Sequence, residues 1–276
     1  MKKYINILLA LSILLLLCMF IKAYSNAHID DADIRDLPSP KNNDVCEIVY
    51  NKCSNSISLP ILLDSGKDDE IVKHTYYTLS YNEKHEQANW VQYLVTRQMI
   101  NGSIDRDGQF VEDESVSTYS SKSADYKKSG YDRGHLCPAA DMKLNAKCMQ
   151  ETFYMSNVSP QKHQFNAGIW LDLENYVRDL VDEYDSLYIV TGPVLNDHLS
   201  YIYGKYNAIS IPEYFYKVIY SSSHNFMQGY LIPHNVTYKT KKDISSYRVP
   251  VDSIESFTDI DFFGGVYNEE MLEKQY

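Results

Sequence analysis

Hydrophobic and polar positions follow two different periods along this chain. Strands are predicted where β-branched and aromatic residues cluster between turn-forming residues, at 76–81, 90–100, 153–158, 187–190, 214–220 and 226–232. The last two predict a hairpin, because only a short polar stretch (222–225) separates them.

Helical spacing begins at Asn166. From there apolar residues recur at every third or fourth position, at Ile169, Trp170, Leu173, Val177, Leu180, Val181 and Tyr184. Shorter helices are predicted near 252–257 and 268–274. Many strands and few helices indicate an α+β fold.

The amino end has another pattern. Lys2 and Lys3 precede a nearly uninterrupted apolar run over 5–21, and small residues such as Ala23 follow it. This order is typical of a cleavable secretory signal, but an uncleaved membrane anchor and lipid attachment at Cys18 stay open. All three place the protein outside the cytoplasm, as a secreted, periplasmic or outward-facing membrane-anchored protein.

The chain therefore divides into a signal peptide or membrane anchor (1–25), a polar and acidic linker (26–55) and one globular domain (56–276). Outside the leader there are four cysteines, at positions 46, 53, 137 and 148. In an exported protein they favour disulfides Cys46–Cys53 and Cys137–Cys148, with buried free thiols as the alternative.

Charge is distributed unevenly. The net charge is −11, from 37 acidic and 26 basic residues, which excludes a globally basic nucleic-acid binder. Residues 121–165, however, contain seven lysines and arginines and only four acidic residues, so this basic island has a net charge of +3. Such an island can hold a polyanion, although charge alone equally describes a solvated loop.

Chemistry-bearing residues concentrate in and after this island. The motif Asp132-Arg133-Gly134-His135 places a cation, a flexible residue and a titratable base together. Downstream lie Ser156-Asn157…Pro160-Gln161 and Asn166-x-Gly168-x-Trp170…Leu173-Glu174. An amide oxygen at Asn166 can ligate a hard cation such as Mg²⁺, and Glu174 follows about 80° around the predicted helix.

With these motifs the chain resembles the DNA/RNA non-specific endonucleases of the ββα-metal (His-Me finger) class, which include endonuclease G. The resemblance extends to Arg106…Phe110…Asp113 and to Val249-Pro250…Ile254-Glu255…Asp261-Phe262-Phe263. It covers about residues 75–265 and implies that 56–276 is the endonuclease domain, with a central antiparallel sheet flanked by helices.

The resemblance also implies roles. His135 would be the general base that takes a proton from the attacking water, with a pKa near the working pH. Asn166 would be the single direct protein ligand of Mg²⁺, for which Mn²⁺ can substitute. Arg106 and Arg133 would bind the phosphate, and Glu174 would hold metal-bound water or an arginine. Asn157 would support the geometry of the site, as would a Cys137–Cys148 bridge.

The implied activity is hydrolysis of phosphodiester bonds in DNA and RNA, without marked sequence or sugar specificity, leaving 5′-phosphate ends. The substrate would be held through phosphate contacts, which carry no sequence information. Two alternatives stay open: a catalytically silent nucleic-acid-binding protein at the cell surface, and a phosphodiesterase with another substrate. Oligomeric state is also open. Four histidines are expected to be ordinary surface or satisfied residues, at positions 163, 198, 224 and 234.

Overall fold

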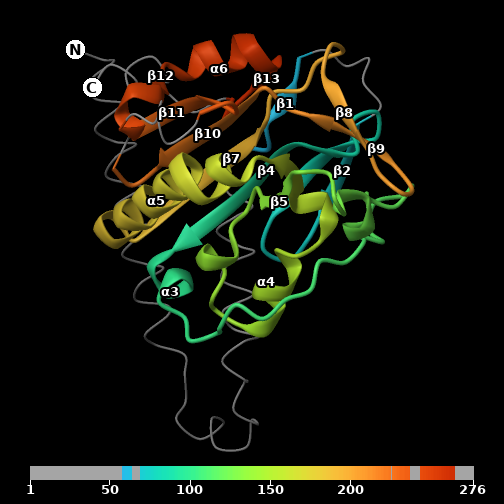
Figure 1. Cartoon of the computed structure of the whole chain (residues 1–276). Coiled ribbons are helices and arrows are strands. Elements are labelled where there is room, and N and C mark those ends of the chain that lie inside the picture. Colours follow the sequence, from blue (N-terminus) through green and yellow to red (C-terminus); the bar gives the residue numbers. More distant parts are fainter. Residues whose placement is uncertain (1–57, 64–68, 225, 237–242, 265–276) are drawn as a thin grey trace, which may run out of the picture. The chain divides into compact units, whose positions relative to one another are not determined.

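The computed structural model describes residues 58–63, 69–224, 226–236 and 243–264. In this part of the chain the main element is a seven-stranded antiparallel sheet of order β12-β11-β10-β7-β4-β3-β2 (Figure 1). Its strands are β2 (Asp69–Lys73), β3 (Thr78–Asn82), β4 (Gln87–Thr96), β7 (Ser186–Pro193), β10 (Tyr214–Ser221), β11 (Phe226–Pro233) and β12 (Arg248–Val249).

Three two-stranded antiparallel ribbons accompany this sheet. They pair β1 (Ile61–Leu62) with β13 (Ile260–Asp261), β5 (Asp132–His135) with β6 (Val158–Gln161), and β8 (Ser200–Tyr203) with β9 (Ala208–Ile211). The helical segments are α3 (Arg97–Ile100), η1 (Ser123–Tyr126), η2 (Ala139–Asp141), α4 (Ala146–Glu151), η3 (Met155–Asn157), η4 (Phe165–Trp170), α5 (Leu171–Tyr184), η5 (Ile244–Tyr247) and α6 (Val251–Thr258).

Both faces of the central sheet are covered, which explains why its inner strands β4, β7 and β10 are buried along nearly their whole length rather than at alternate residues. On β10, successive side chains point to opposite faces. Phe215 packs against Trp170 at the start of α5, with ring centroids 5.7 Å apart, whereas Tyr216 packs against Phe262, at 5.3 Å. Helix α6 lies over the Phe262 face, close enough that a Cβ on Gly229 would lie 2.8 Å from Ile254 Cδ1.

The α+β class and the antiparallel sheet flanked by helices are confirmed, as are the hairpin β10–β11 and helix α6. Two boundaries are wrong. The predicted strand over 90–100 ends at Thr96, whose hydroxyl caps helix α3 by accepting from the Met99 N–H at 3.3 Å. The predicted strand over 153–158 is mostly the turn η3, and the strand begins only at Val158.

The predicted Cys137–Cys148 disulfide is wrong, because both thiols are buried and free. Cys148 lies in the first turn of α4, where Asn145 caps the helix. Its thiol turns back to donate to the carbonyls of Met142, at 3.1 Å, and Asn145, at 3.0 Å. The helix cap therefore engages the sulfur that the disulfide would have used.

Several predictions fall outside the described residues: the signal or anchor, the linker, the helix near 268–274 and the Cys46–Cys53 pair. The division into segments stays a prediction. No helix in the part of the chain that the structure describes is long and apolar enough to cross a bilayer.

Candidate active site

One cavity of about 460 Å³ brings together the residues that the motifs single out. Its lining includes Arg106, Arg133, His135, Asn166 and Glu174. They come from four segments: the loop after α3, strand β5, the turn η4 and helix α5. The structure thus places five of the six predicted site residues around one space, while their individual roles stay predictions.

The ribbon β5–β6 explains the spacing of the motif. Residues two apart on a strand share a face, so Arg133 and His135 point to the same side. Gly134, between them, faces Gln161 across the ribbon, and a Cβ there would lie 2.2 Å from Gln161 Oε1. The glycine is needed because a larger residue would displace the buried Gln161 side chain, which covers this face of the ribbon between Arg133 and His135.

His135 is buried in a way that leaves one nitrogen without a partner. Its side chain is packed between the rings of Phe110 and Phe153, each 5.1 Å away between centroids. Nε2 is buried, and no hydrogen-bond partner reaches it among the described residues. Burial and the positive charge of Arg106 lower the pKa of His135 to about 3, so the imidazole is neutral at ordinary pH. This pKa lies well below the near-neutral value expected from the sequence.

The two arginines rest on the same pair of phenylalanines. The guanidinium carbon of Arg133 lies 5.0 Å from the Phe110 centroid, and that of Arg106 lies 5.8 Å from the Phe153 centroid. Both guanidinium groups belong to exposed residues, and Arg133 also donates to Ser123 Oγ at 2.9 Å. Phe110 and Phe153 therefore position two cations and the imidazole together.

Phe153 was not identified as a site residue from the sequence, and Phe110 entered only as part of the family pattern. A signal for Phe153 lies in Gly108, where a Cβ would be 2.1 Å from the Phe153 ring. That signal is invisible without knowing that residues 45 positions apart are neighbours in space.

Asn166 is oriented by the aspartate of the same motif. Asp132 Oδ2 accepts from Asn166 Nδ2 at 3.1 Å and bonds His163 Nδ1 at 2.9 Å. With its nitrogen directed at Asp132, the amide leaves its oxygen available in the cavity. This role of Asp132 was not predicted from the sequence, whereas His163 is a surface residue as predicted, with its side chain 76% exposed.

The donors suit a hard cation held mainly by water. An amide oxygen from Asn166 and a carboxylate from Glu174 are the ligand types that Mg²⁺ accepts while it keeps most of its water shell. Among the described residues, no group of three or more His, Cys, Asp or Glu side chains could hold a metal. The residues present therefore fit a site with few protein ligands.

Glu174 separates the cavity from a cluster of buried charges. Burial raises the pKa of Glu174 to about 7, against the opposing charge of Lys217. Lys217 is fully buried, and its Nζ lies 4.9 Å from the ring centroid of Trp170, one helical turn before Glu174. Behind it, Asp141 accepts from Arg178 Nη1 at 2.7 Å. Lys217 was not singled out because, from the sequence, it is an ordinary strand residue.

Asn157 lies behind the cavity rather than in its wall. Its Oδ1 accepts from the Cys137 N–H at 2.8 Å, and its Nδ2 donates to the carbonyls of Cys137 and Thr152, both at 2.9 Å. These bonds hold the chain just after His135, which is the kind of support predicted for Asn157.

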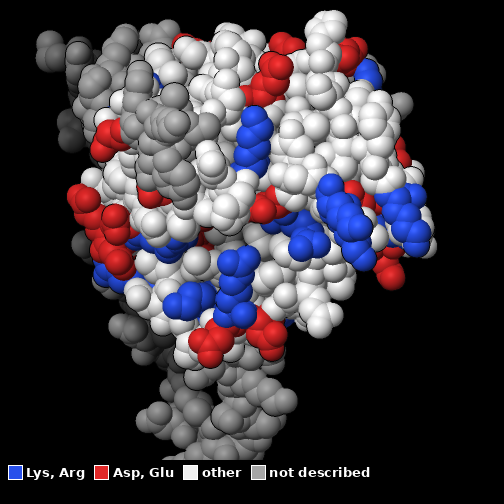
Figure 2. Space-filling model, viewed as in Figure 1, with Lys and Arg blue, Asp and Glu red and all other residues white. Residues whose placement is uncertain are grey.

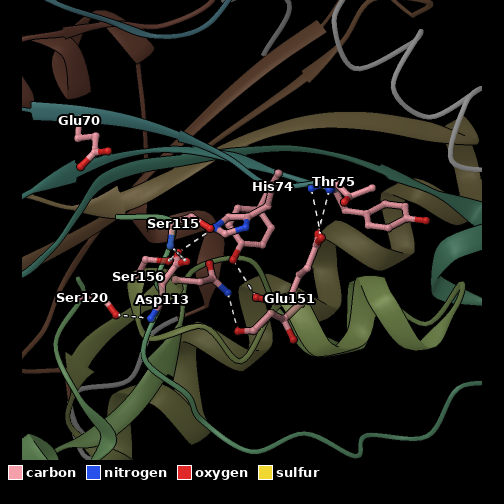
Figure 3. Close-up of polar contacts among 12 residues, drawn as sticks. Glu70, His74, Thr75, Asp113, Ser115, Ser120, Glu151 and Ser156 are labelled. Atoms are coloured by element: carbon pink, nitrogen blue, oxygen red, sulfur yellow. Dashed lines mark hydrogen bonds and ion pairs between the residues drawn. The ribbon is translucent and has the colours of Figure 1, made fainter. Parts of the chain in front are cut away.

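A second buried polar cluster holds the loop that carries Arg106 and Phe110 (Figure 3). Asp113, at the end of this loop, pairs with His74 Nε2 at 2.8 Å and accepts from the Ser156 hydroxyl and from the Ser115 N–H. Burial alone would raise the pKa of Asp113, but these bonds and the charge of His74 together lower it. Glu151 nearby accepts from the Thr75 and Tyr76 N–H groups at 3.3 and 3.1 Å.

Three of the histidines not singled out lie away from the cavity wall. His234 is buried, and both its nitrogens are bonded, to the Pro212 carbonyl and the Lys162 N–H, each at 2.7 Å. His224 bonds Ser223 Oγ at 2.8 Å, and His198 is exposed.

Comparisons with known proteins agree with this geometry. The sequence pattern of the DNA/RNA non-specific endonuclease family matches residues 61–269. Nuclease C1 of Cunninghamella echinulata var. echinulata is 32% identical over 224 residues, covering 76% of this chain and 88% of that protein. Human mitochondrial endonuclease G is 35% identical over 193 residues, covering 65% of this chain and 64% of that protein.

The similarity extends to three dimensions. In a crystal structure of EndoG in complex with the inhibitor EndoGI, the matched chain is 35% identical, with a TM-score of 0.65. The match covers 71% of this chain and 86% of that one. For mitochondrial nuclease EXOG of Danio rerio the match spans 65% of the relative's length, so the chain spans slightly less than two thirds of these two mitochondrial relatives.

Proposed function

The chain belongs to the DNA/RNA non-specific endonuclease family, and we propose from this that it is a metal-dependent endonuclease that hydrolyses phosphodiester bonds in DNA and RNA. We propose further that it has no marked sequence or sugar specificity and leaves 5′-phosphate ends. The observation that carries the proposal is the shared cavity, where an unpartnered imidazole nitrogen, two arginines, an amide and a carboxylate meet.

His135 accepts the proton of the attacking water on a ring nitrogen. It can do so because the residue lines the cavity and because the ring is neutral. Burial lowers the pKa of His135, and the charge of Arg106 lowers it further. A phosphate bound to Arg106 would offset the second of these two contributions.

Arg106 and Arg133 bind the scissile phosphate and stabilise the negative charge that develops in the transition state. Contacts with the Phe153 and Phe110 rings restrict the movement of the two guanidinium groups before substrate binds. Preorganisation of this kind is effective because the donors need not reorient as the charge develops.

Asn166 would be the direct protein ligand of Mg²⁺, or of Mn²⁺ in its place, and Glu174 would hold water of the ion's shell. When bound, the ion would neutralise charge on the phosphate and help the leaving oxygen depart. Asp132 keeps the Asn166 amide in one orientation, so that its oxygen rather than its nitrogen faces the cavity.

Each of these groups addresses phosphate, metal or water, and none reads a base edge. This supports action on both DNA and RNA without sequence preference. Figure 2 shows basic side chains across the middle and right of the face that carries the cavity, although the net charge of the chain is −11. Substrate binding is therefore expected to weaken steeply with salt. We propose that the enzyme works outside the cytoplasm, on the strength of its leader sequence.

The direct test is to incubate the purified protein with plasmid DNA and with RNA, with Mg²⁺ and with EDTA. Cleavage of both substrates that stops with EDTA, with 5′-phosphate ends on the products, supports the proposal. Salt-sensitive retention of nucleic acid without cleavage would instead identify a binding protein.

A further inference from the structure

The tip of hairpin β8–β9 exposes aromatic side chains in a molecule that buries most of its rings. Tyr203 is 84% exposed and Tyr206 is 55% exposed. Between them lie Gly204 and Lys205, at the turn of the hairpin. Exposed aromatic rings at one point of the surface are candidate contacts for a ligand with flat, unsaturated groups.

The backbone of this tip is held by hydrogen bonds to a buried carboxylate. Asp125, a buried residue of η1, accepts from the N–H groups of Tyr206 at 2.6 Å and Asn207 at 3.3 Å. Its other oxygen accepts from Asn207 Nδ2 at 3.3 Å. Gly204 lies so close that a Cβ there would be 2.4 Å from Asp125 Cβ. A buried carboxylate thus holds the turn, and with it the base of the Tyr206 side chain.

Two ammonium groups lie over the Tyr206 ring. Lys205 Nζ is 4.7 Å and Lys122 Nζ is 5.1 Å from its centroid. Lys122 also pairs with Glu112 at 3.0 Å, but both side chains are partly exposed, and such pairs are weak enough for a phosphate to compete. When a base stacks on this ring, the two flexible lysine side chains can move from the ring face to the flanking phosphates, so that stacking and phosphate contacts are available at one place.

This surface is connected to the cavity. Ser123, the neighbour of Lys122, accepts a hydrogen bond from Arg133 of the cavity wall. On its inner side the hairpin shares a buried apolar cluster with Val158, the residue of β6 that pairs with His135. Figures 1 and 2 together show several basic side chains at the right of the view, on the side where the β8–β9 hairpin lies.

We propose that the β8–β9 tip is a second substrate-binding surface, which holds an unpaired stretch of nucleic acid next to the site of cleavage. In this proposal, which rests on the proposed endonuclease function, Tyr206 stacks on a base and Lys205 and Lys122 contact the flanking phosphates. Bases in a duplex already stack on one another, so the surface favours single strands over duplexes of the same length.

The test measures binding apart from cleavage. In the background of His135→Ala, fluorescence anisotropy of a labelled single strand of about 20 nucleotides gives the Kd with and without Tyr206→Ala. We expect Tyr206→Ala to weaken single-strand binding about tenfold and duplex binding much less, while Tyr206→Phe retains the affinity. Phe257→Ala is the matched control, since Phe257 on α6 is 56% exposed, and it should leave binding unchanged.

The lysines give a second readout. Lys205→Ala should make the slope of log K against log salt shallower by about 0.7 for single strands, which corresponds to one lost phosphate contact. Equal single-strand affinity for Tyr206→Ala and its parent, with an unchanged salt slope for Lys205→Ala, would overturn the proposal even if the wild-type chain cuts nucleic acid. If the wild-type protein does not cut nucleic acid but these variants still lose affinity, the binding surface is supported and the proposed endonuclease function is refuted.

Discussion

Two histidines of this protein, His74 and His135, contact the same loop through different residues. The loop between α3 and η1 contacts His135 through Phe110 and pairs with His74 through Asp113. The His74 Nε2 has a carboxylate partner at 2.8 Å, whereas the His135 Nε2 has none in the part of the chain described. One histidine has a carboxylate beside it, and the other has the cation Arg106.

The difference separates a histidine that completes a structural network from the proposed general base. A buried polar atom without a partner costs free energy, so a fold retains it only where the surroundings compensate. His74 completes a hydrogen-bonded network that fixes the loop (Figure 3). His135 instead leaves Nε2 buried without a partner in the part of the chain described, lies at the wall of a cavity and packs against two aromatic rings.

The largest expected effect is on catalysis at His135. Because a general base contributes about 10²–10⁴-fold and the whole site depends on it, His135→Ala should lower plasmid cleavage by about three orders of magnitude or more. Its thermal unfolding should stay cooperative. His74→Ala is the matched control: assayed below its melting temperature, it should cut within about tenfold of the wild type. Activity of His135→Ala within tenfold of the wild type would refute the general-base role.

A smaller effect is expected at the proposed metal ligand. Asn166→Ala should raise the Mg²⁺ concentration for half-maximal cleavage by about 100-fold or more, because loss of the single direct protein ligand should exceed the roughly 10–100-fold effect of losing an outer-shell partner. Asp132→Ala should shift the requirement in the same direction, since it frees the Asn166 amide to rotate. Asn196→Ala, at an exposed asparagine, serves as control. Superimposable Mg²⁺ titrations for Asn166→Ala and the wild type would exclude this role.

The smallest expected effect is a loss of folding stability, and it concerns the hydrogen-bonded network around His74. Asp113→Asn should lower the free energy of unfolding by about 1–3 kcal/mol, because it weakens a buried charge-assisted network. The pKa of Asp113 is lowered in the folded state, so its contribution is complete above the unfolded pKa and disappears as pH falls through the folded value. Urea denaturation at acidic pH should therefore show a flatter pH dependence for Asp113→Asn. An equally steep dependence in the variant would assign the acid sensitivity to other groups.

The sequence predicted those parts of the fold that depend on local periodicity. The apolar spacing after Asn166 leads to α5, and the polar stretch 222–225 separates β10 from β11. The start of the helix was less regular than predicted, because Gly168 has non-helical dihedral angles and η4 is a wide turn. Asn166 and Glu174 nevertheless line one cavity.

What could not be predicted depends on contacts between distant residues. Phe153 contacts both His135 and Arg106 because the chain folds back across β6, and no local sequence pattern identifies it as a site residue. Lys217 follows strand spacing, but it is buried beside Glu174 rather than exposed. The prediction of a Cys137–Cys148 disulfide was wrong for the same reason, since the direction of the Cys148 side chain depends on the cap of its helix.

The most direct test of the account is a double-mutant cycle on His135 and Asn166, measured as kcat/KM for plasmid cleavage at a fixed Mg²⁺ concentration that saturates the wild type but not Asn166→Ala. Residues that act as one unit lose activity non-additively, because the first substitution already removes what the second would. We expect the His135→Ala/Asn166→Ala protein to be no more than about tenfold slower than the slower of the two single variants. Losses that multiply in full would show that the imidazole and the amide act independently, and would contradict a single reaction centre in this cavity.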